Sequence, residues 1–250
     1  MSPAPNLQPV HPARRFHILG SFLAVGLLIS LLTMALFAVI AYGVVGIAAV
    51  SRFDLDIATT LHNGATATGI RIFTAITALG NQPILTALAI GITVVLLLLR
   101  RRLLALGTAL TAVGGGLLNA ALKAGFHRTR PVFANPYVVE QSWSFPSGHA
   151  MSSLIGYGVL LYVIVVLFRP HWLRTVAVSL LICLIELIGF SRLYLGAHYV
   201  SDVMAGYAAG ITWLTISITG MERTRRRGLK RVGDDGSPAD KSAGYRGTKP

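Results

Sequence analysis

The sequence is poor in cysteine and in charge. Its 250 residues include a single cysteine, Cys183, so neither an intramolecular disulfide nor a cysteine-based metal cluster is possible. Only 12% of the residues are charged and 54% are hydrophobic, a balance far more apolar than that of a water-soluble domain. Acidic residues are especially scarce, nine against 22 lysines and arginines. These deficits exclude a disulfide-stabilised secreted domain and favour a membrane protein.

Apolar runs that approach or exceed the length of a membrane span occur six times. A transmembrane helix needs about 20 predominantly apolar residues. The runs are Ile18–Val50, Ile84–Leu99, Leu103–Leu122, Met151–Phe168, Leu173–Phe190 and Val203–Thr219. Between the first two, Arg52–Gln82 mixes polar with apolar positions, as is typical of a segment lying on the membrane surface. We therefore predict an all-α polytopic membrane protein with six transmembrane helices and an amphipathic extracytoplasmic segment between the first two.

The net charge of +13 is concentrated in a few segments. Two basic residues precede the first span, three form the Arg100–Arg102 cluster, two lie at Arg169 and Arg174, and nine follow Met221. If the N-terminus is cytoplasmic, all 16 of these residues lie inside, as the positive-inside rule requires. The charge thus predicts a multi-pass protein of the plasma (inner) membrane with both termini cytoplasmic. The basic tail is interpreted as a topology signal in contact with membrane lipids, and no nucleic acid partner is expected.

The chain divides into three parts by composition. Residues 1–17 form a proline-containing cytoplasmic arm, 18–220 a six-helix membrane domain, and 221–250 a basic cytoplasmic tail. Both ends lack an apolar period and are predicted to be disordered. Within the membrane domain, Gly114–Gly116 and the Gly206-x-x-x-Gly210 spacing predict sites of close helix contact.

The order of the spans places three polar clusters on the extracytoplasmic side. The first contains Lys123 and Arg130-Pro131, the second is Pro146-Ser147-Gly148-His149, and the third contains Ser191-Arg192, His198 and Asp202. Polar groups at a membrane are costly unless they are paired or functional. Two histidines, a carboxylate and three cations on one face supply what phosphoryl transfer needs: a nucleophile, an acid and cations around the oxygens.

Local spacing assigns chemistry to two of these clusters. Ser147 is a good N-cap before an apolar run, and free amides at such a helix start bind phosphate oxygens, while Gly148 allows close approach. His198 and Asp202 are four residues apart, so they share a face if a helix begins near His198. A carboxylate on one ring nitrogen fixes the imidazole tautomer and leaves the other nitrogen free to attack. The same spacing also suits a purely structural pair.

Together the motifs Lys123-x6-Arg130-Pro131, Pro146-Ser147-Gly148-His149 and Ser191-Arg192-x5-His198-x3-Asp202 resemble the complete signature of the type 2 phosphatidic acid phosphatase superfamily. The resemblance spans about Arg52–Gly220. It implies a metal-independent phosphatase, without cofactor, that hydrolyses a phosphomonoester or diphosphate of a lipid. The catalytic residues it implies are His198 as the nucleophile, Asp202 as its orienting partner and His149 as the general acid. The residues it implies for holding the phosphoryl oxygens are Lys123, Arg130, Ser147, Gly148 and Arg192.

Several alternatives remain open at the level of sequence. A lipid-phosphate binding or transport protein, or a lipid phosphotransferase, also fits a six-span bundle with a polar face. Vanadium haloperoxidases have a similar signature, but those relatives are soluble. Phosphatidic acid, phosphatidylglycerol phosphate and polyprenyl diphosphates, such as undecaprenyl diphosphate, all combine a charged head with an apolar tail. Glu186, an acid inside a predicted span, is either a partner of Arg192 or a locally paired structural residue.

Overall fold

Helices account for most of the residues that the structure describes. The computed structural model describes residues 12–168 and 170–235. The helices in this part are α1 (Pro12–Gly46), α2 (Ala48–Asn63), α3 (Ala67–Ala78), α4 (Gln82–Leu98), α5 (Arg102–Phe126), α6 (Gly148–Leu167), α7 (His171–Tyr194) and α8 (Val200–Asp235). No strand occurs among the described residues. Six segments are long and apolar enough to cross a membrane, which confirms the predicted all-α polytopic membrane protein with six spans.

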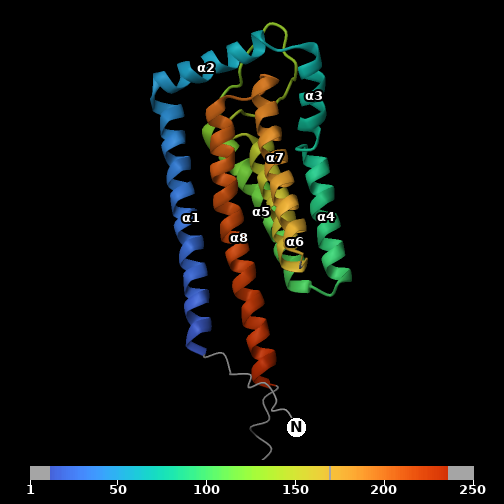
Figure 1. Cartoon of the computed structure of the whole chain (residues 1–250). Helices are drawn as coiled ribbons and strands as arrows, with labels where there is room; N and C mark the ends of the chain where they lie inside the picture. Colours follow the sequence, from blue (N-terminus) through green and yellow to red (C-terminus); the bar gives the residue numbers. More distant parts are fainter. Residues whose placement is uncertain (1–11, 169, 236–250) are drawn as a thin grey trace, which may run out of the picture.

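The segment between the first two spans follows the prediction only in its first half. Helix α2 lies across one end of the bundle and joins α1 to α3 (Figure 1). Helix α3 instead continues into α4, and Ala67–Leu98 together form the second candidate span. The reason is packing, because Phe73 of α3 contacts the rings of Phe190 and Tyr194 on α7. The amphipathic surface segment is therefore shorter than the predicted Arg52–Gln82.

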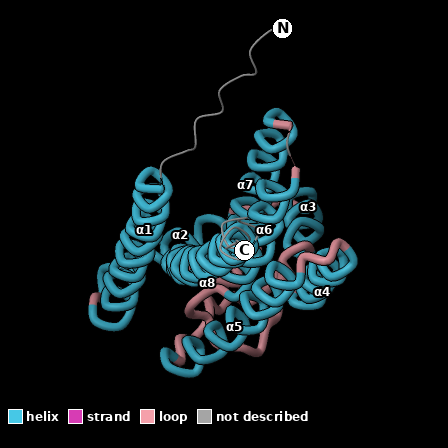
Figure 2. The backbone as a smooth tube through the Cα atoms, turned by 90° about the horizontal axis from the view of Figure 1, so that it is seen from below, coloured by secondary structure: helices cyan, strands magenta, loops and turns pink. Residues whose placement is uncertain are grey.

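Helices α6 and α8 form the centre of the bundle. Figure 2, a view along the bundle, shows α8 between α1 and the remaining helices. A Cβ on Gly206 of α8 would lie 2.7 Å from the Ser147 carbonyl oxygen, so glycine allows α6 and α8 to touch. The predicted close contact is present there, and at Gly114 and Gly115, which Trp213 covers. Gly116 differs, since no heavy atom lies within 4 Å of its Cβ position.

Large apolar side chains remain exposed on the outer helices, among them Val39 at 68% and Leu98 at 77% exposure. Water-soluble proteins rarely expose such extended apolar surface, so it suits lipid contact. The start of α1 and the end of α8 lie at the end of the bundle opposite α2 (Figure 1).

Helix α8 extends beyond the predicted boundary of the membrane domain. The prediction of disorder from residue 221 is wrong for 221–235, which are helical, and α1 likewise begins at Pro12 inside the predicted arm. Glu222 explains the extension in part: it is 4% exposed, accepts hydrogen bonds from Arg225 at 2.8 Å, and accepts another from the Tyr162 hydroxyl at 3.2 Å. Residues 1–11 and 236–250 of the predicted arm and tail lie outside the described residues.

Candidate active site

The three polar clusters of the sequence meet at the end of the bundle where α2 lies. Lys123 is in the last turn of α5, His149 in the first turn of α6, and His198 in the turn between α7 and α8. All three line one cavity of about 170 Å³. The other residues that line it are Gly80, Gln82, Asn119, Arg130, Glu140, Ser142, Gly148 and Ser152.

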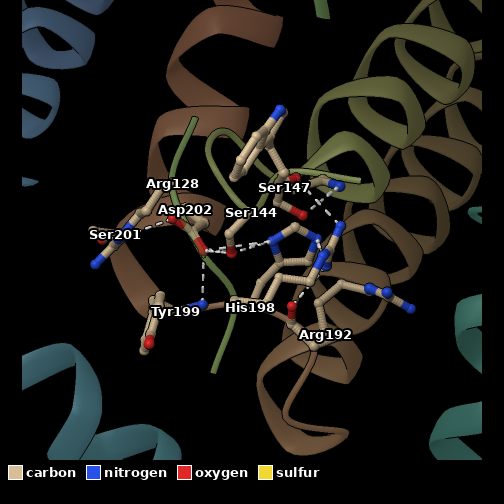
Figure 3. A network of polar contacts seen from close by, with 12 residues as sticks. Arg128, Ser144, Ser147, Arg192, His198, Tyr199, Ser201 and Asp202 are labelled. Atoms are coloured by element: carbon tan, nitrogen blue, oxygen red, sulfur yellow. Dashed lines mark hydrogen bonds and ion pairs between the residues drawn. The ribbon is translucent and has the colours of Figure 1, made fainter. Parts of the chain in front are cut away.

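His198 is 1% exposed, and its two ring nitrogens face different partners. Nδ1 lies 3.4 Å from Asp202 Oδ2 and 3.3 Å from the Ser144 hydroxyl, while Nε2 lies 2.9 Å from Nη1 of Arg130 (Figure 3). Arginine only donates hydrogen bonds, so Nε2 is the acceptor and the ring proton is on Nδ1. Burial lowers the pKa of His198 to about 3, although Asp202 opposes this. The imidazole is therefore neutral at neutral pH, with its lone pair on the nitrogen that faces the cations.

Asp202 is fully buried and accepts hydrogen bonds at both oxygens. Oδ2 accepts from the Ser144 hydroxyl at 2.5 Å and from the Tyr199 amide at 2.9 Å, and Oδ1 accepts from Arg128 at 2.6 Å. Helix α8 begins at Val200, so Asp202 lies in its first turn and its carboxylate lies next to the His198 ring. This agrees with the expectation that a helix beginning near His198 brings the two side chains to one face. Sequence reasoning missed Ser144 and left Arg128 without a role.

His149 is oriented by a residue from a different helix. Its Nε2 lies 2.8 Å from Oδ1 of Asn81, the residue that precedes α4. An amide oxygen accepts only, so this contact places the proton of His149 on Nε2. Gly80 allows the approach, since a Cβ there would lie 3.1 Å from the His149 ring. The sequence placed Asn81 only within the segment between the first two spans, without a role at the site.

Two of the three predicted cations, Lys123 and Arg130, line the same cavity, and the third, Arg192, is paired with Glu140, which also lines it. Arg130 donates to the carbonyl oxygens of Ser142 and Ala197, each at 2.7 Å. Lys123 donates to the Trp143 carbonyl oxygen. Arg192 is 1% exposed and donates to the Thr77 hydroxyl at 2.9 Å, while its Nε has no hydrogen-bond partner. Burial lowers the pKa of Arg130, with Asp202 acting against it.

The carboxylate that pairs with Arg192 is Glu140 and not Glu186. Glu140 contacts Arg192 through one oxygen and Arg130 through the other, the latter at 2.8 Å. Glu186 is exposed on α7. The prediction that Glu186 supports Arg192 came from proximity in sequence, whereas Glu140 reaches the site from the loop between α5 and α6, 52 positions before Arg192.

Ser147 does not offer the free amide that the sequence suggested. The Ser147 amide donates to the Asp202 carbonyl oxygen at 2.9 Å, and the Ser147 hydroxyl accepts from the Ala150 amide at 3.5 Å. Ser147 is fully buried and does not line the cavity. In this structure it caps α6 and fixes α6 to α8. Gly148 does line the cavity, and a Cβ there would lie 3.2 Å from Asn119 Nδ2.

An apolar groove of about 510 Å³ begins at the polar cavity and runs between α4, α5 and α6. The groove and the cavity share Gln82 and Ser152. Small side chains leave it open, among them Ala109, Ala112 and Gly116.

The six apolar spans define the class of this protein as an integral membrane protein, and its buried His–Asp pair faces a cavity lined by cations. The model of the PAP2 superfamily matches residues 102–226, half of the chain, and the chain belongs to that superfamily. This confirms the resemblance inferred from the three motifs.

Two relatives and one solved structure are similar to this chain. Phosphatidylglycerophosphatase B of Bacillus subtilis (strain 168) is 41% identical over 98 residues, 38% of this chain and 47% of that protein. An undecaprenyl-diphosphatase of Sulfolobus acidocaldarius is 30% identical over 54% of this chain and 64% of that protein. The chain thus spans about half to two thirds of the length of these relatives. The crystal structure of the first transmembrane PAP2 type phosphatidylglycerolphosphate phosphatase from Bacillus subtilis aligns with a TM-score of 0.73 at 29% identity, covering 78% of this chain and 96% of that one.

Proposed function

We propose that this protein is an integral-membrane lipid phosphatase that hydrolyses a phosphomonoester or diphosphate through a phosphohistidine on His198. The observation that carries the proposal is the state of that residue: a neutral imidazole whose Nε2 lone pair faces Arg130, and whose other nitrogen faces Asp202. A structural His–Asp pair has no need of a cationic cavity at its free nitrogen. The names of the similar proteins support the same chemistry.

In the first step Nε2 of His198 attacks phosphorus, and the bond between phosphorus and the leaving oxygen breaks. His149, protonated on both nitrogens, gives a ring proton to that oxygen, and the contact between its Nε2 and Asn81 orients the ring. Lys123, Arg130 and Arg192 hold the equatorial oxygens, where negative charge is greatest in the transition state. Asp202 stabilises the positive ring of the phosphohistidine.

In the second step water attacks the phosphohistidine. His149, now neutral, takes a proton from the water, and the bond between Nε2 of His198 and phosphorus breaks. Inorganic phosphate leaves, and both histidines return to their first state. We assign no role in contact with the phosphoryl group to Ser147, because both its amide and its hydroxyl are engaged elsewhere.

The apolar groove supports a lipid as substrate. A phosphate in the cavity would leave its tail at Gln82 and Ser152, where the groove of about 510 Å³ begins. Phosphatidylglycerol phosphate, phosphatidic acid and polyprenyl diphosphate each have such a tail. We place the site on the extracytoplasmic face and both termini in the cytoplasm, because 16 of the 22 basic residues then lie inside.

The proposed activity is tested by phosphate release from the purified protein in detergent with excess chelator. Release is expected from at least one of the three lipids, with inhibition by vanadate, and with a much lower KM than for a water-soluble phosphate ester that lacks a tail. No release from any lipid, together with tight lipid binding, would favour a binding protein. Loss of all activity with chelator would contradict the metal-free mechanism.

Glu140 is expected to compete with substrate. Its carboxylate lies between Arg130 and Arg192, where a phosphate would lie, and it is partly exposed. Replacing Glu140 by glutamine should lower KM and the vanadate inhibition constant about two- to fivefold, because a partly exposed ion pair is worth roughly 0.2–1 kcal/mol. Glu186→Gln, at an exposed site on α7, is the matched control. A higher KM for Glu140→Gln would show that Glu140 organises the arginines instead of competing with substrate.

A further inference from the structure

A buried acid on α2 reaches the candidate active site although it lies outside the three signature motifs. Asp54 is 1% exposed although it belongs to the helix that lies across the end of the bundle. Its Oδ1 accepts from the Ser201 amide at 3.1 Å, and its Oδ2 accepts from the Ser201 hydroxyl and from Arg128 Nη2, the latter at 2.8 Å. Asp54 is thus fixed to the first turn of α8, close to Asp202.

Arg128 joins Asp54 to Asp202. One guanidinium nitrogen faces Asp54, and the other donates to Asp202 Oδ1 at 2.6 Å and to the Ser201 hydroxyl at 2.7 Å (Figure 3). The guanidinium carbon lies 4.3 Å from the ring centroid of Tyr199. Burial acts to lower the pKa of Arg128, but the two carboxylates outweigh it and the pKa is raised. A planar guanidinium can bridge two carboxylates in this way, whereas an ammonium cannot.

Stability alone does not account for this bridge. Buried ion pairs are often no more stabilising than well-packed apolar residues of similar volume, because desolvating the charges is costly. What the bridge does is fix Asp202: Arg128 holds Oδ1, so Oδ2 is directed at Ser144 and His198. Without Arg128 the carboxylate would be free to turn, and the Nδ1 proton of His198 would lose its fixed acceptor.

We propose that Asp54 and Arg128 are positioning residues for the nucleophile, acting through Asp202. This proposal rests on the proposed phosphatase function of His198. Arg128 sets the rotation of the Asp202 carboxylate, and Asp54 sets the position and compensates the charge of Arg128. Asp202 then holds His198 in the tautomer whose lone pair is on Nε2. Helix α2 thereby contributes to catalysis although none of its residues lines the polar cavity.

The test uses Asp54→Asn and Arg128→Lys in the full-length protein, with Asp56→Asn, an exposed acid on the same helix, as control. Asp54→Asn and Arg128→Lys should each lower kcat by about tenfold to 100-fold, as expected when a catalytic group is misplaced by a fraction of an ångström. The KM for the lipid phosphate should stay within about twofold, because Lys123, Arg130 and Arg192 are untouched. Arg128→Lys keeps a cation between the two carboxylates, so it still tests the proposal if Asp54→Asn fails to fold.

A double-mutant cycle separates positioning from a general structural role. If Asp54 acts only through Asp202, then Asp54→Asn should cause no further loss of kcat in an Asp202→Asn background. An equal loss in both backgrounds, or unchanged kcat for both Asp54→Asn and Arg128→Lys, would overturn the proposal. An inactive wild-type protein would instead refute the phosphatase function itself, so the two failures are distinguishable.

Discussion

Replacing His198 by alanine is expected to lower kcat for phosphate release by roughly 10⁴-fold or more, because the covalent route is lost with its nucleophile. Alanine leaves Lys123, Arg130 and Arg192 in place around the cavity, so vanadate should lose its covalent contact with the ring while lipid phosphate still binds. The measurement is the initial rate of phosphate release together with lipid affinity.

The control for His198→Ala is His171→Ala. His171 is an exposed histidine at the first position of α7, at the end of the bundle away from the cavity. Its replacement should leave kcat and KM unchanged. A His198→Ala protein that is folded and retains a tenth of the wild-type rate would mean that another group attacks phosphorus.

Replacing Asp202 by asparagine is the second large expected effect. The side chain keeps its shape, but its amide nitrogen offers a proton where His198, Ser144 and the Tyr199 amide need an acceptor. The tautomer with the lone pair on Nε2 is then no longer enforced. In the Ser-His-Asp triad, where an aspartate also orients a histidine, replacing that aspartate by asparagine lowers kcat by about 10⁴-fold. A loss of roughly 10² to 10⁴-fold in kcat is expected here.

Measuring KM together with kcat distinguishes the role of Asp202 from the substrate-binding role of the cations. Asp202 does not line the cavity, so Asp202→Asn should change KM much less than kcat. Asp56→Asn should change neither. A loss confined to KM would place Asp202 among the substrate-binding groups and contradict its role as the partner of the nucleophile.

Much of the fold is predictable from local sequence. The six spans follow from runs of apolar residues, and their order alone brings Lys123, His149 and His198 to one end of the bundle. The His198–Asp202 pair is equally local, since His198 lies in the turn just before α8 and Asp202 lies in the first turn of that helix. Helix α3 was misjudged because its polar positions suggested a water-facing side, whereas Phe73 packs on α7.

The partners of the site residues were not predictable in the same way. Glu140, Asp54 and Asn81 contact their partners across 52 to 147 positions of sequence, and no periodicity in the sequence indicates such a pairing. Asp54 did carry a weak signal, an acid between Phe53 and Leu55 in an otherwise mixed segment. Ser147 shows a different ambiguity, because an N-cap and a phosphate ligand look the same in sequence.

Trapping the phosphorylated protein tests most directly whether His198 is the residue that becomes phosphorylated. The purified protein is mixed with a lipid phosphate that carries a radiolabel in the phosphoryl group, quenched in alkali within the first turnover, and digested. If His198 is the nucleophile, the label is expected to be stable in alkali and lost in acid. It is expected on the peptide that contains His198 and is expected to be absent from His198→Ala. Label retained by His198→Ala, or rapid hydrolysis with no labelled protein at any time within the first turnover, would contradict this role of His198.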